Sequence, residues 1–103
     1  MKVFNLKTMP SFPYEQRDKN VFYRSPEFKA RIIELPPGGS LPDCDMDSFV
    51  VFTVIQGMVS VNVNGKESRL QAGECLITEP ARLSMKTQDG VRIMGLQIMK
   101  KSE

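Results

Sequence analysis

The chain has 103 residues, a length that suits one domain with its own hydrophobic core. Hydrophobic residues make up 41% and charged residues 25%, a globular composition that argues against disorder. The net charge is +2 and the basic residues are scattered, which excludes the basic stripe that follows a nucleic-acid backbone. The chain contains no histidine, which excludes His-based acid–base catalysis and every imidazole metal site.

Neither a membrane span nor an export signal is expected. The longest apolar run, Phe49 to Ile55, is far too short to cross a bilayer. Met1 and Lys2 are followed by a mixed segment without the apolar stretch of a signal peptide. We therefore expect a cytoplasmic protein that binds neither membranes nor nucleic acid.

Residues 1–26 are interpreted as a lead-in to the domain. Lys2 to Leu6 is compatible with a short strand. Pro10, Pro13 and Pro26 break helices and central strands alike, so little regular structure is expected around them.

From Glu27 onward, short apolar stretches separated by turn signals predict strands. The expected strands span 27–35, 48–56, 58–63, 66–70, 74–78, 81–87 and 91–99. Asn64-Gly65 is the strongest hairpin signal, and Pro36 to Gly39 also predicts a turn. Many short strands at roughly even spacing are typical of an all-β domain, an antiparallel sandwich or barrel.

Two groups of residues in this pattern have motif-like spacing. The first comprises Gly38, Cys44, Met46, Val50 and Gly57, and the second comprises Gly73, Pro80, Arg82, Met85 and Asp89. With these spacings the chain resembles the cupin superfamily of small jelly-roll barrels, over residues 30–98. The resemblance implies a single antiparallel jelly-roll barrel spanning residues 27–100.

The resemblance also implies where a metal site would lie. In metal-binding cupins, three His and one Glu project into the barrel and hold iron, manganese, zinc or nickel. The corresponding residues here are Cys44, Met46, Val50 and Met85, which offer neither imidazole nor carboxylate. Such ions need oxygen or nitrogen ligands, and the His–Asp base of the metal-free sugar epimerases is missing too. We therefore predict no metal cofactor and no conventional cupin enzymatic activity.

One interpretation is that the barrel interior is apolar, because Met fills space flexibly and free Cys packs like a small hydrophobic residue. The barrel is then either a filled core or a pocket for a small, largely apolar molecule, and the protein is a binding, sensory or interaction module. The residues expected to line the pocket are Cys44, Met46, Val50, Phe52, Val54 and Met85.

Two alternatives remain open. Cys44, Met46 and Met85 offer one thiol and two thioethers, which are soft ligands that select Cu(I). An unconventional enzyme with Cys44 or Cys75 as nucleophile is also conceivable, although no partner base is evident. Both cysteines are expected as free thiols, and the sequence does not decide whether Cys75 points inward.

Strand alternation assigns other charged residues to solvent. Asp43, Asp45 and Asp47 are expected to face away from Cys44 and Met46. Four arginines are expected on the wet surface by the same alternation, namely Arg31, Arg69, Arg82 and Arg92.

The odd-numbered residues Phe49, Val51, Thr53 and Ile55 lie on the opposite face of their strand from the predicted pocket residues. If these side chains were exposed to solvent, they would form an apolar patch whose area lies near the upper limit for soluble monomers. Either the lead-in of the same chain or a second copy of the chain could cover this face. Small cupins commonly pair through such a face and often exchange their first strand, so the resemblance implies a homodimer.

Overall fold

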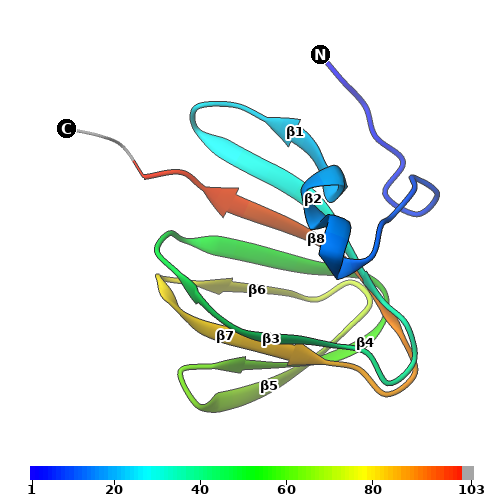
Figure 1. Ribbon diagram of the computed structural model, residues 1–103, viewed down its shortest axis with the longest axis vertical. Coiled ribbons are helices and arrows are strands. Elements are labelled where there is room, and N and C mark those ends of the chain that lie inside the picture. The colour runs from blue at the N-terminus through cyan, green and yellow to red at the C-terminus, as the bar shows by residue number, and fades with distance from the viewer. Residues whose placement is uncertain (101–103) are drawn as a thin grey trace.

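All strand pairings in the computed structural model, which describes residues 1–100, are antiparallel (Figure 1). The elements are η1 (Tyr14–Asn20), β1 (Val21–Arg24), β2 (Phe28–Leu35), β3 (Ser40–Met46), β4 (Val50–Val63), β5 (Lys66–Gln71), β6 (Cys75–Thr78), β7 (Ala81–Lys86) and β8 (Val91–Ile98). Over this part of the chain, no helix is long and apolar enough to cross a membrane. The predicted all-β class is confirmed.

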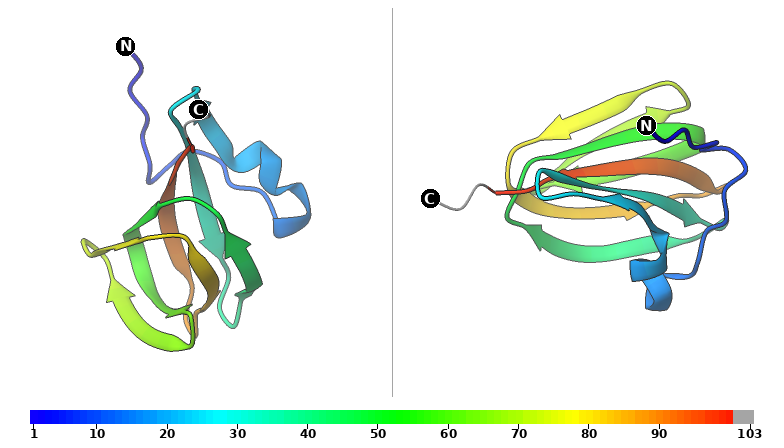
Figure 2. Two further views of the ribbon diagram at one scale, coloured as in Figure 1. Left: turned by 90° about the vertical axis from the view of Figure 1, so that its left-hand side faces the viewer. Right: turned by 90° about the horizontal axis from the view of Figure 1, so that it is seen from above.

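β4 belongs to two sheets. Its first half pairs with β8 and β6, and its second half pairs with β7 and β5. β2 and β1 continue the first sheet beyond β8, while β3 continues the second sheet beyond β7. The strands therefore curl around a common interior, as the two views of Figure 2 show. This arrangement confirms the antiparallel barrel.

The transition between the two sheets occurs at Gly57. Gly57 has a φ of +87°, and a Cβ there would lie 2.3 Å from the carbonyl oxygen of Gly90. Glycine lets β4 pass this close to the turn before β8. The sequence pattern predicted two strands divided at Gly57, whereas the structure has one bent strand of 14 residues.

The bend also changes which side chains of β4 face the interior. Val50 and Val54 point inward before it, and Val59 and Val61 point inward after it. The inward set therefore changes from even to odd numbers, across the register shift between Val54 and Gln56. Both halves of β4 thus contribute to one hydrophobic core.

The lead-in contains two elements that the sequence pattern did not predict. Lys2 to Leu6 forms no strand, whereas Val21–Arg24 forms β1 and pairs with β2 of the same chain. Tyr14–Asn20 forms the 3-10 helix η1, which is too short to produce a recognisable periodicity. Strand exchange between two chains stays a prediction.

Aromatic residues of the lead-in pack over the outer face of β2 and β8. The rings of Phe4 and Phe22 meet edge to face, with centroids 4.7 Å apart. Tyr23 stacks on Phe28 at 5.5 Å. Ala30 of β2, which borders the same group of side chains, is only 5% exposed. The lead-in therefore covers this part of the barrel in the same chain.

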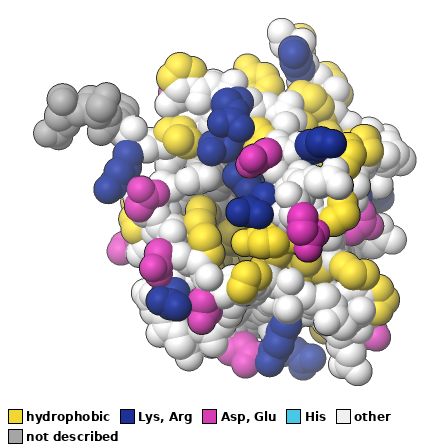
Figure 3. Space-filling view, viewed as in Figure 1, with side chains coloured by type: hydrophobic (Ala, Val, Ile, Leu, Met, Phe, Trp, Pro, Cys, Tyr) yellow, Lys and Arg dark blue, Asp and Glu magenta, His cyan; other side chains and the backbone are white. Residues whose placement is uncertain are grey.

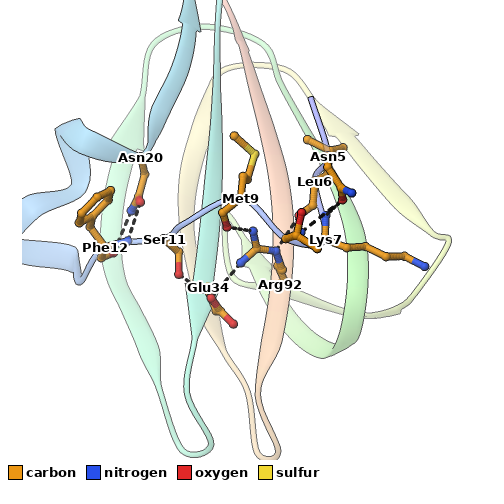
Figure 4. Close-up of polar contacts among 10 residues, drawn as sticks. Asn5, Leu6, Lys7, Met9, Ser11, Phe12, Asn20, Glu34 and Arg92 are labelled. Atoms are coloured by element: carbon orange, nitrogen blue, oxygen red, sulfur yellow. Dashed lines mark hydrogen bonds and ion pairs between the residues drawn. The ribbon is translucent and has the colours of Figure 1, made fainter. Parts of the chain in front are cut away.

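Arg92 anchors the lead-in to β8 (Figure 4). It is only 6% exposed, so the prediction of a solvent-exposed arginine is wrong. Its Nε donates to the Leu6 carbonyl at 2.7 Å, Nη2 donates to the Met9 carbonyl, and Nη1 pairs with Glu34 at 2.9 Å. Strand alternation correctly placed Arg92 on the outer face of β8. It could not reveal that the lead-in, which is distant in the sequence, covers this residue.

Gly57→Ala should destabilise the barrel more than Gly73→Ala. Both glycines have positive φ, +87° and +90°, so each alanine bears about 1 kcal/mol of left-handed strain. A Cβ at Gly73 meets open space, whereas at Gly57 it meets backbone. Overpacking there should cost about 2 kcal/mol more in the free energy of unfolding, measured with urea. Equal losses in the two variants would contradict this account of the bend.

Arg92→Met should lower the free energy of unfolding by about 2–3 kcal/mol, because it leaves the Leu6 and Met9 carbonyls without their charged donor. Limited proteolysis should then cut faster within residues 1–20. Arg69→Met is the matched control, since Arg69 is exposed on β5 and its loss should change stability by less than about 0.5 kcal/mol. Unchanged stability and proteolysis in Arg92→Met would show that the anchor is not needed.

Candidate functional site

A cavity of about 260 Å³ lies inside the barrel and opens to solvent. β2, β3, β4, β7 and β8 form its walls, and η1 borders it. Figure 3 shows hydrophobic side chains gathered around a hollow in the middle of one face, with basic side chains beside it. At about 30 Å³ per molecule, the volume corresponds to roughly nine waters, enough for a small organic molecule.

Most residues that the sequence assigned to a pocket lie around this cavity. The lining includes Cys44, Met46, Val50, Phe52 and Met85. Val50, Phe52 and Met85 are buried, and Cys44 is exposed. Val54 is placed differently from the prediction, because it is 1% exposed and packs into the core without lining the cavity.

Gly95 makes room for the cavity. The register aligns Arg31 of β2, Gly95 of β8 and Phe52 of β4 across the first sheet. A Cβ on Gly95 would lie 3.4 Å from Cε1 of Phe52 and 3.5 Å from Cγ of Arg31. A larger side chain there would extend into the space between them. No sequence motif marked Gly95 as a site residue.

Arg31 faces the cavity and is half-buried, so the prediction of a wet surface residue is wrong. Its neighbours Ile32 and Ile33 are both apolar, so the inner face of β2 could not be chosen from the residue pattern. Burial lowers the pKa of the Arg31 guanidinium. The Asp18 carboxylate opposes this pKa shift, and the positive charges of Arg24 and Arg17 add to it.

The lead-in brings two further side chains to the cavity. The Arg17 guanidinium carbon lies 4.3 Å from the centroid of the Tyr14 ring, and Arg17 Nη1 donates to the Tyr14 carbonyl at 3.1 Å. The buried Asn20 side chain exchanges hydrogen bonds of 2.7 and 2.9 Å with the Phe12 backbone, which holds the ends of this segment together (Figure 4). No sequence motif marked Tyr14 or Arg17 as site residues.

Arg82 and its acidic neighbours lie outside the cavity. Arg82 approaches Asp43 at 3.7 Å and Asp45 at 3.8 Å, and all three side chains are largely exposed. Asp47 is exposed as well. The predictions that these three aspartates and Arg82 face solvent are confirmed. Surface pairs of this kind add little stability.

The donors at the metal-site positions of the cupin motif are sulfur atoms. Cys44 Sγ lies 3.9 Å from Met46 Sδ, and Met85 lines the same cavity. Among residues 1–100, no group of three His, Cys, Asp or Glu side chains could hold a metal ion. The site therefore does not fit the harder ions of metal-binding cupins. Cys75 is a free, exposed thiol on β6 and does not line the cavity.

No protein-family model and no curated protein matches the chain. Solved structures do match it, and they assign the cupin fold that the motif spacing predicted.

Three of these structures illustrate the similarity. The Cnp3 cupin domain of Schizosaccharomyces pombe has a TM-score of 0.70 and 24% identity, over 78% of this chain and 61% of that one. A cupin superfamily protein of Desulfitobacterium hafniense has a TM-score of 0.73 and 9% identity, covering 78% and 74%. An RmlC-like cupin of Shewanella frigidimarina has a TM-score of 0.70 and 20% identity, covering 77% and 72%. Such identities support the fold alone.

Proposed function

We propose that the protein binds a small, largely apolar molecule in the barrel cavity and acts as a binding or sensory module. The observation that carries this proposal is the cavity of about 260 Å³ bounded by Val50, Phe52 and Met85. Removing apolar ligand surface from water against such walls contributes about 25 cal/mol per Å². The few polar groups at the mouth would orient the ligand, as in most small-molecule sites.

The side chains around the cavity favour binding over conventional cupin catalysis. The described lining contains no carboxylate and no lysine, and the sequence has no histidine. An ordinary general base therefore does not face the space. The cysteine-enzyme alternative gains nothing from these surroundings, because none of the described residues that line the cavity beside Cys44 is such a base.

Cu(I) binding through Cys44, Met46 and Met85 stays a separate prediction. The 3.9 Å between Cys44 Sγ and Met46 Sδ is compatible with two ligands of one soft ion. The apolar walls that extend beyond these sulfur atoms favour an organic ligand as the first proposal.

Toluene and indole should each raise the Tm, because a ligand that binds only the folded state stabilises it by mass action. Gly95→Leu should abolish the shift by filling the cavity. Gly95→Ala should retain it, because its Cβ makes ordinary contacts of 3.4–3.5 Å. Differential scanning fluorimetry measures the shift, and circular dichroism checks that both variants fold. If no small apolar compound raised the Tm of the wild type, the proposal would be wrong.

We also propose that two copies associate through the outer face of the first sheet. Phe49, Ile77 and Ile98 are 49%, 67% and 40% exposed. Ile77 pairs with Val51, and the Ile98 amide donates to the Phe49 carbonyl at 3.0 Å, so these side chains belong to one region. The lead-in covers the outer face over β2 and β8, and a second copy would bury apolar surface on this remaining part.

Light scattering at micromolar concentration should return twice the mass of the chain for the wild type. Phe49→Asp should return the single-chain mass, because it puts a charge in the contact. Met58→Asp is the matched control, since Met58 is 46% exposed on the other half of β4 and should leave the dimer intact. A single-chain mass for the wild type would contradict the dimer.

A further inference from the structure

Building on the proposed function, we propose that the ligand is a small carboxylate with an apolar body. The body would occupy the cavity between Phe52 and Met85, and the carboxylate would bind the guanidinium of Arg31 with help from Arg17. This assigns a ligand class to the cavity and a recognition role to two arginines.

The Arg31 guanidinium is unpaired within the described part of the chain. Among residues 1–100, no hydrogen bond and no ion pair engages its guanidinium, whereas Arg92 and Arg82 both meet carboxylates. Arg31 is nevertheless half-buried and lines the cavity. A charged group taken partly out of water without a partner is costly, and a bound anion would offset that cost.

The charges around the mouth favour an anion. Among the residues that the structure describes, no Asp or Glu lines the cavity, while Arg17 and Arg31 both do. Asp18 acts on Arg31 favourably through space but forms no ion pair with it within the described chain, and Arg17 and Arg24 repel it. An entering carboxylate would therefore meet a net positive mouth and a guanidinium with free N–H donors.

Arg17 is held in position to take part. It stacks on the Tyr14 ring, with its guanidinium carbon 4.3 Å from the ring centroid, and its Nη1 donates to the Tyr14 carbonyl. These contacts leave other N–H donors of its guanidinium free. Because Arg17 is more exposed than Arg31, water and salt weaken its interaction with an anion, and it is the secondary contact.

The walls and the volume limit the apolar part of the ligand. The row from Arg31 through Gly95 to Phe52 places Arg31 on one side of the apolar space and Phe52 on the other. A volume of roughly nine waters admits a molecule of about nine non-hydrogen atoms. A planar carboxylate matches the fork of a guanidinium, so one or two N–H donors suffice to hold it.

Benzoate and benzamide test the inference because they have the same shape and size but differ in charge. Both are titrated at neutral pH into the protein, and the amide NMR signals of Gly95 and its neighbours report occupancy of the cavity. We expect benzoate to bind at least tenfold more tightly than benzamide. In Arg31→Met the two affinities should become equal, through loss of benzoate affinity alone.

Three variants control the interpretation. Arg69→Met removes the same charge from exposed β5 and should leave both affinities unchanged. Arg17→Met should weaken benzoate by a smaller factor than Arg31→Met, and Arg31→Lys should restore part of the preference. Because Arg31 has no partner to lose among the described residues, Arg31→Met should not lower the Tm, which separates recognition from a structural role.

The unfavourable outcomes are distinguishable. Equal affinity for benzoate and benzamide in the wild type would overturn the anion inference and leave apolar binding in place. A benzoate preference that survives in Arg31→Met would also overturn it, because the carboxylate would then lie elsewhere. If neither compound shifts the cavity signals, the inference is overturned, and failure with toluene and indole as well removes the proposed function.

Discussion

The close approach of Gly57 to the carbonyl oxygen of Gly90 is the constraint on which the barrel depends. It lets one strand, β4, turn from the first sheet into the second without interruption. Because the bend changes which side of β4 faces inward, valines from both halves reach the same core. The sheets are thereby held around an interior, and the missing side chain at Gly95 leaves part of that interior open.

The lead-in links the stability of the barrel to the site. Arg92 binds two of its backbone carbonyls on the outer face of β8. Farther along, the Asn20 side chain pairs with the Phe12 backbone, and the segment between them brings Arg17 to the cavity. One segment thus covers apolar surface on the outside of the sheet and adds a positive charge at the mouth.

The barrel could be predicted from the sequence because strand alternation and glycine spacing are local signals. The same signals placed Met46 and Met85 toward the interior. Arg31 and Arg92 were assigned wrongly, since their surroundings depend on which face of a strand turns inward and on cover by a distant segment. η1 and β1 were not predicted, because they are short and are stabilised by contacts with β2 that leave no periodic pattern in the sequence.

We infer that the barrel encloses an apolar space with a positively charged mouth. Crystals grown with 4-iodobenzoate test it most directly, because anomalous scattering locates the iodine atom. The account predicts iodine beside Phe52 and Met85, with the carboxylate directed toward Arg31. A barrel interior filled by its own side chains, with no iodine inside, would contradict it.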